Sequence, residues 1–167
     1  RAIDTFMSLL IEAGAGLLVD VRSYPGSKRY PQFARDLLKS SLAGHGIGYH
    51  HMPELGGLRQ EYPQAIGVEA VDKKWRGYAA YVQSSSYLKA QDRVFTLHLE
   101  KGPVVLMCAE REPENCHRRF IADSLQAKGF RVCHLLSAEQ RRDHKFHPSA
   151  VFNGVHMTYP RIQGDLF

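Results

Sequence analysis

Short apolar runs alternate along this chain with segments that carry apolar residues at helical spacing. The runs are GLLVDV, IGYHH, VVLMC and FRVCHL. The helical segments are residues 4–14, 31–44, 71–82, 86–102 and 113–128. Parallel strands need a long crossover, usually a helix, so this alternation predicts an α/β fold. We expect a single domain of three layers, in which a mostly parallel sheet has helices on both faces.

The periodic pattern ends well before the chain does. Its 167 residues match the length of one domain. We place the α/β domain at residues 1–139. Residues 140–167 are polar and basic, with Arg141, Arg142 and Lys145 close together, and we interpret them as an irregular C-terminal tail.

Charge and cysteine content indicate a compartment. No apolar run approaches the roughly 20 residues of a membrane span, and the N-terminus lacks the pattern of a signal peptide. Three cysteines are too few for a disulfide framework, and an odd number leaves at least one thiol free. We therefore expect a cytoplasmic protein without membrane contact. The formal charge of +5 suits a nucleic-acid or nucleotide partner and is equally ordinary for a cytoplasmic domain.

Polar residues follow three of the predicted strands where each strand ends. Ligands of open α/β sheets bind beyond the carboxyl ends of the strands, so we expect these residues to meet at one cleft. They are Asp20, Arg22 and Ser23 after the first strand, His50, His51 and Glu54 after the second, and Cys108 and Glu110 after the third.

Two carboxylates in this set are candidates for acid–base work. Asp20 and Glu110 follow different strands, and neighbouring strand ends would bring them close enough to shift each other's pKa. The alternative is structural: Asp20 would form an ion pair with Arg22 or Arg118.

The stretch CAEREPENCHRR, residues 108–119, joins a strand to a helix. The N-terminus of a helix favours anions, yet His117 and Arg118 are cationic and fall there. Either the nearby glutamates compensate them, or a bound phosphate or carboxylate does.

Cys116 also lies near this helix start, where the helix dipole and His117 would lower the pKa of its thiol. It is therefore a candidate nucleophile, and its alternative role is that of a small core residue. Cys108, at the end of an apolar strand, is expected in the core.

Two familiar cysteine sites do not fit the spacing. Cysteine phosphatases need an arginine six positions after the cysteine, and six after Cys108 is Glu114. Cys108, Cys116 and His117 also depart from the short Cys-x-x-Cys spacing of structural zinc sites. We therefore expect no metal and no cofactor.

The order and spacing of LLVDVRSYPGS, IGYHHMPELGG and VVLMCAEREPENCHRR resemble the domain-of-unknown-function family 488. The resemblance covers about residues 6–136 and implies a compact α/β domain with these motifs around one pocket. Members usually begin with a strand that this chain lacks, so we expect one sheet strand to be missing. The matched residues are Asp20, Arg22, Ser23, Pro25, Ser27, Leu55, Gly56, Gly57, Cys108, Glu110, Cys116, His117 and Arg118.

The last residues, QGDLF, resemble the peptide by which bacterial DNA-processing proteins dock on the sliding clamp. Such a peptide is extended, with a polar anchor and two apolar side chains for a pocket. The alternative is that the apolar pair folds back on the domain. The candidate partner-binding residues are Gln163, Asp165, Leu166 and Phe167.

Our leading hypothesis is an enzyme acting on a phosphate-bearing or nucleic-acid-derived substrate. One alternative is a non-catalytic nucleic-acid or clamp-binding module, and another is a thiol redox or sulfur-handling protein that uses Cys116. The candidate catalytic residues are Asp20, Glu110, Cys116 and His117. The candidate substrate- or anion-binding residues are Arg22, Ser23, Ser27, Gly56, Gly57 and Arg118.

Overall fold

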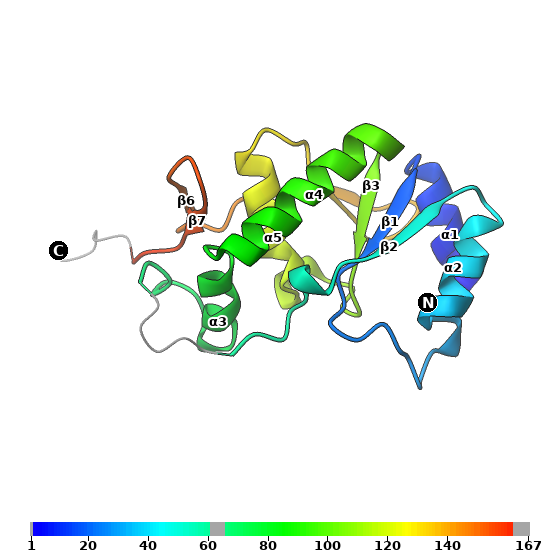
Figure 1. Ribbon diagram of the computed structural model, residues 1–167, viewed down its shortest axis with the longest axis horizontal. Helices are drawn as coiled ribbons and strands as arrows, with labels where there is room; N and C mark the ends of the chain where they lie inside the picture. Colours follow the sequence, from blue (N-terminus) through cyan, green and yellow to red (C-terminus); the bar gives the residue numbers. More distant parts are fainter. Residues whose placement is uncertain (1, 61–65, 162–167) are drawn as a thin grey trace.

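A three-stranded parallel sheet forms the centre of the computed structural model, which describes residues 2–60 and 66–161 (Figure 1). Its strands are β1 (Leu17–Asp20), β2 (Gly48–His51) and β3 (Val104–Met107), in the order β2-β1-β3. Asp20 pairs in register with His51 on one side and with Met107 on the other. The carboxyl ends of the strands are therefore level, and the residues that follow them start from one edge. The predicted mixed α/β class and parallel central sheet are confirmed.

Five α-helices accompany the sheet within the described residues. They are α1 (Ile3–Glu12), α2 (Arg35–Ala43), α3 (Lys73–Tyr81), α4 (Ser85–Lys101) and α5 (Arg118–Ala127). The α4 helix has a side-chain N-cap, because Ser84 Oγ accepts a hydrogen bond of 3.2 Å from the Tyr87 amide.

The predicted helix 113–128 is wrong before Arg118. Residues Pro113–Asn115 form a 3-10 turn, and Cys116 is extended with φ −137° and ψ 144°. The α-helix starts only after His117. This break in the helix turns Cys116 back toward the sheet.

Side chains of β1 divide between two buried clusters. Leu17 and Val19 pack in the larger cluster, together with residues of α3, α4 and α5. Leu18 packs in the smaller cluster with residues of α1 and α2. This alternation follows from the two-residue period of a strand. Asp20, the last residue of the strand, is buried as well.

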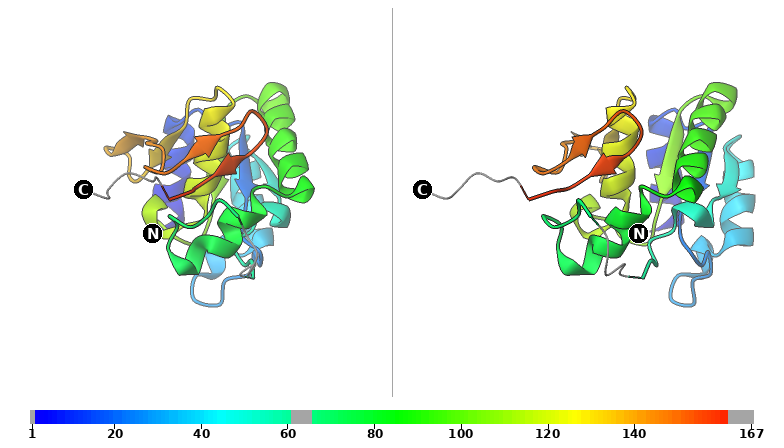
Figure 2. Two further views of the ribbon diagram at one scale, coloured as in Figure 1. Left: turned by 90° about the vertical axis from the view of Figure 1, so that its left-hand side faces the viewer. Right: turned by 60° about the vertical axis from the view of Figure 1, so that its left-hand side comes forward.

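The predicted fourth strand is present but does not extend the parallel sheet. Strand β4 (Cys133–Leu135) pairs antiparallel with β5 (Arg141–Asp143), so that Leu135 faces Arg141. A second hairpin joins β6 (Val151–Phe152) to β7 (Met157–Thr158). It lies beside α5 in both views of Figure 2.

Residues after position 139 contribute to the core. Met157 and Tyr159 belong to the larger cluster and are almost fully buried. The division of the chain at residue 139 stays a prediction. Residues 162–167, with the predicted clamp-docking peptide at Gln163, Asp165, Leu166 and Phe167, lie outside the described residues. No helix in the described part of the chain is both long and apolar enough to cross a membrane.

Candidate functional site

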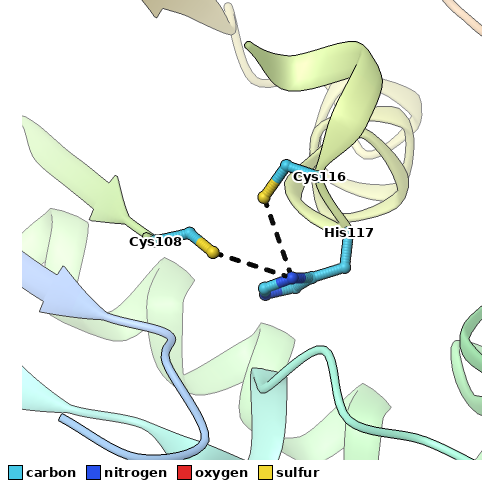
Figure 3. Close-up of side chains that lie close together, drawn as sticks. All are labelled: Cys108, Cys116 and His117. Carbon is cyan, nitrogen blue, oxygen red and sulfur yellow. Dashed lines mark hydrogen bonds between the residues drawn. The ribbon is translucent and has the colours of Figure 1, made fainter. Parts of the chain in front are cut away.

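Two cysteines and a histidine meet where β3 ends and α5 begins (Figure 3). Cys108 follows the last residue of β3, and the 3-10 turn at residues 113–115 brings the chain back toward it. Cys108 Sγ lies 3.9 Å from His117 Nδ1, and Cys116 Sγ lies 3.7 Å from the same atom. The three atoms all lie within 4.8 Å of one another and so could share a metal ion.

Arg118 donates hydrogen bonds to the sulfur of Cys116. Its backbone N–H and its Nε–H donate to Cys116 Sγ at 3.5 and 3.2 Å. Its guanidinium also donates to the carbonyl oxygens of Leu106, Glu110 and Arg111. Arg118 forms no ion pair with a carboxylate in residues 2–60 and 66–161. Of the two alternatives for Arg118, compensation by nearby glutamates is not seen among these residues, where its donors reach carbonyl oxygens and a sulfur instead.

The surroundings shift the pKa values of the two thiols in opposite directions. A hydrogen bond from Cys108 lowers the pKa of Cys116 far below the ordinary thiol value, and hydrogen bonding to His117 and the charge of Arg118 add to this. The same hydrogen bond, together with burial, raises the pKa of Cys108. The Cys116 thiol therefore ionises more readily than the Cys108 thiol.

His117 is fixed on several sides. Its side chain is 5% exposed, and its ring centroid lies 5.0 Å from that of Tyr78. The backbone of Gly57 lies against the ring at Nδ1 and Cγ, because a Cβ atom at this glycine would overlap both atoms. His117 Nε2 is buried without a hydrogen-bond partner in the described structure. The ring therefore presents Nδ1 to the two sulfurs and has little freedom to turn.

Asp20 has the structural pairing that was the alternative to a catalytic role. Arg22 donates to both carboxylate oxygens, from Nε at 2.8 Å and from Nη2 at 2.6 Å. Tyr49 donates to Oδ2 at 2.7 Å. Burial and the hydrogen bond to Asp20 raise the pKa of Tyr49 to about 12. The Arg22 side chain also donates to the Phe33 carbonyl, so its guanidinium is largely occupied.

The remaining predicted residues are more dispersed. Glu110 is exposed, and its carboxylate has no ion pair among the described residues. Ser23 Oγ accepts from the Leu58 amide at 3.4 Å, and a Cβ atom at Gly56 would overlap this hydroxyl. Ser27 Oγ accepts from the Tyr30 amide at 3.0 Å. Ser23 and Gly56 thus join the ends of two strands, whereas Ser27 shapes an exposed turn.

A cavity of about 970 Å³ opens beside this cluster, lined by parts of α1, β3 and β4. Of the predicted site residues, Arg22, Ser27, Cys108, Glu110 and Arg118 line it. The other predicted residues, among them Asp20, Cys116 and His117, lie outside its lining. Sequence reasoning missed several polar residues of this wall, and these are Arg111, Arg131, His134 and Arg141.

His134 is the end of a buried polar chain that the sequence analysis also missed. Its Nε2 lies 2.9 Å from His144 Nδ1, and His144 Nε2 lies 2.8 Å from Asp123 Oδ1. Asp123 also accepts from the Tyr159 hydroxyl at 3.0 Å. The accumulation of histidines in residues 134–147 was the available signal.

Comparison with protein-family models matches residues 2–125 to one family, described as "Domain of unknown function DUF488". Comparisons with curated proteins and with solved structures find no match. The matched segment holds the whole cluster of Cys108, Cys116 and His117, together with Gly57. It covers well over half of the chain, and this protein therefore belongs to the DUF488 family.

Proposed function

We propose that this protein is an enzyme acting on a phosphate-bearing or nucleic-acid-derived substrate that binds in the cavity beside β3. The observation that carries the proposal is the charge of the wall. Glu110 is the one carboxylate among the lining residues. The lining arginines are Arg22, Arg111, Arg118, Arg131 and Arg141. A cleft with one sign of charge concentrates ligands of the opposite sign, so an anionic substrate suits it.

The arginines differ in how free they are to bind a ligand. Arg22 and Arg118 are held by Asp20 and by backbone carbonyls, so they contribute charge rather than direct contacts. Among residues 2–60 and 66–161, Arg131 has only a long, exposed pair with Asp143, at 3.6 Å. Arg141 donates to the Glu12 carbonyl at 2.9 Å and keeps other donors. We therefore assign the substrate phosphate to Arg131 and Arg141.

Calorimetric titration with AMP and with a 5′-phosphorylated oligodeoxynucleotide tests this assignment. We expect Arg131→Gln with Arg141→Gln to weaken binding at least about tenfold, with affinity falling as salt rises. The control is Lys89→Gln with Arg93→Gln, which removes the same charge from exposed positions on α4, outside the cavity. Equal losses in the two double variants, or no loss in the first, would contradict the proposal.

We infer that the fold around the substrate cavity has three layers, with the parallel sheet between two layers of helices. The separate clusters around Leu18 and around Leu17 and Val19 support this inference. Figure 1 draws α1 and α2 to one side of the sheet, and α4 and α5 to the other. We also propose a cytoplasmic location, because all three cysteines are free thiols.

A thiol redox enzyme is the second candidate, supported by the proximity of Cys108 Sγ and Cys116 Sγ. In such an enzyme the Cys116 thiolate would attack a substrate disulfide and release one thiolate. Cys108 would then lose its proton, attack the Cys116 sulfur and release the second, leaving a Cys108–Cys116 disulfide. The test is a mass measurement after mild oxidation, with Cys116→Ser as the control.

We also propose that the C-terminal peptide docks on a bacterial sliding clamp, an interaction compatible with either enzyme. The support is the match of Gln163, Asp165, Leu166 and Phe167 to the clamp-binding pattern. Deleting Asp165–Phe167 is expected to abolish binding to immobilised clamp. Clamp affinity that survives the deletion would rule this interaction out.

A further inference from the structure

We propose that Cys108, Cys116 and His117 bind a divalent transition metal of the zinc class. The inference rests on the distances between the three atoms. Around tetrahedral zinc, with metal–sulfur distances of about 2.3 Å and metal–nitrogen distances of about 2.0–2.1 Å, neighbouring sulfur and nitrogen atoms lie about 3.6 Å apart. The two sulfur–nitrogen distances here, 3.9 and 3.7 Å, are within a few tenths of an ångström of this value, and all three atoms lie within 4.8 Å of one another.

The orientation of the histidine supports the same site. Only Nδ1 of the His117 ring has partners in the described structure, and both are sulfur atoms. The ring is held in this orientation by Gly57 and Tyr78. A side chain 95% buried, with one nitrogen aimed between two cysteine sulfurs and the other unpartnered, is placed for ligation rather than for a hydrogen-bond network.

Hydrogen-bond donors around the Cys116 sulfur also suit a metal-bound thiolate. The backbone N–H and the Nε–H of Arg118 donate to Cys116 Sγ. Donors of this kind orient metal-bound thiolates and temper their charge. Two thiolates and a neutral imidazole also balance the charge of a divalent ion, and this donor set selects soft or borderline metals over magnesium and calcium.

The site is an open one. The cluster contains three protein ligands, and no fourth histidine, cysteine or carboxylate joins them among the described residues. Structural zinc sites have four protein ligands, whereas catalytic sites have three and leave one position for water or substrate. Cys108 is itself part of the cavity wall, so the free position is expected to face the cavity. Use of the metal in catalysis rests on the proposed function; its binding does not.

Cobalt(II) is the probe for this site, because thiolate ligands give the bound ion an intense near-ultraviolet charge-transfer band and a tetrahedral field gives visible bands. The full-length reduced protein is freed of metal with a chelator and titrated with cobalt, and the titration is then reversed with zinc. We expect one cobalt per chain, with both sets of bands, and full displacement by zinc. The spectrum of the wild-type protein alone can overturn the proposal: no charge-transfer band at stoichiometric cobalt means no site.

Variants locate the site. We expect Cys108→Ser and His117→Gln each to weaken cobalt binding at least about tenfold. Cys133→Ser is the matched control, because Cys133 is an exposed free thiol outside the cluster. A band that persists in Cys108→Ser, or that is lost in Cys133→Ser, contradicts the assignment. Circular dichroism of each variant shows whether it is folded.

The outcomes separate this inference from the proposed function. Loss of AMP binding in the Arg131 and Arg141 variant with an intact cobalt spectrum supports both proposals. An intact cobalt spectrum without any phosphate binding retains the metal site and overturns the anionic substrate. A reduced protein that ignores cobalt and zinc, yet forms a Cys108–Cys116 disulfide on mild oxidation, overturns the metal site and favours the thiol redox enzyme.

Discussion

The backbone of Gly57 lies against the imidazole ring of His117, so closely that a Cβ atom at position 57 would overlap the ring at Nδ1 and Cγ. The two residues are distant in sequence and come from the loop after β2 and the start of α5. Their contact fixes the only ring nitrogen that reaches both cysteine sulfurs. A glycine is required here for the space that it leaves, since a positive φ is not what distinguishes this position.

Substituting Gly57 by alanine should therefore disturb the cluster directly. We expect Gly57→Ala to destabilise the fold by about 1–3 kcal/mol, as overpacking of a buried site does, and to weaken cobalt binding. Urea unfolding and cobalt titration measure the two effects. The control is Gly26→Ala, where a Cβ atom meets nothing within 4 Å. If Gly57→Ala matches the wild type in both measurements, the ring is not held by this glycine.

Asp20 gives a prediction that separates a structural role from a catalytic one. Its carboxylate is buried and paired with Arg22, so Asp20→Asn leaves an uncompensated cation. We expect a loss of about 3–5 kcal/mol in the free energy of unfolding. Glu100→Gln breaks the exposed pair with Arg93 and should cost less than about 1 kcal/mol. An Asp20→Asn protein of normal stability would instead favour the acid–base role.

The strands and helices near the site were predictable because a local pattern in the sequence indicates each of them. The apolar run before Asp20 indicates β1, and the spacing of Trp75 and Tyr78 indicates α3. The apolar run before Cys108 likewise indicates β3, and Cys108 directly follows the last residue of that strand. These predictions need only neighbours in sequence, so one chain contains enough information to make them.

The cluster itself was not predictable in the same way. Cys116 approaches Cys108 only because a 3-10 turn and one extended residue interrupt the expected helix. Strand β5 escaped detection for a related reason. All three of its residues, Arg141–Asp143, are exposed, so the strand has no buried face and therefore no alternation of apolar and polar residues. Both features depend on contacts between distant segments, which spacing rules do not describe.

The partners of Asp123 predict what happens when the chain is shortened. A chain ending at residue 139 loses His144 and Tyr159 and leaves a buried carboxylate without these hydrogen bonds. It also loses Met157 from the core. We expect this chain to lack the cooperative thermal transition that the chain of 167 residues shows. Calorimetry of the two proteins checks this result. Cooperative unfolding of residues 1–139 would support a separate domain and tail.

His134 predicts how stability changes with pH. Burial, followed by the charges of His144, Arg118 and Arg142, lowers the pKa of His134 to about 4 in the folded protein. The unfolded chain has an ordinary histidine pKa of about 6.5 and so binds more protons between these values. The contribution of His134 to stability is therefore fully present above about pH 7 and is lost as the pH falls toward 4.

The size of this effect is on the order of 1–2 kcal/mol once solvent screening of the partly exposed ring is allowed for. Urea unfolding of the wild type and of His134→Gln at several pH values between 4 and 8 measures it. We expect the variant to lose less stability than the wild type between pH 7 and pH 4, because a neutral glutamine cannot take up the proton. His45→Gln, at an exposed position after α2, is the control and should follow the wild-type curve. Parallel curves for His134→Gln and the wild type would show that the chain from His134 to Asp123 accepts a proton without cost to the fold.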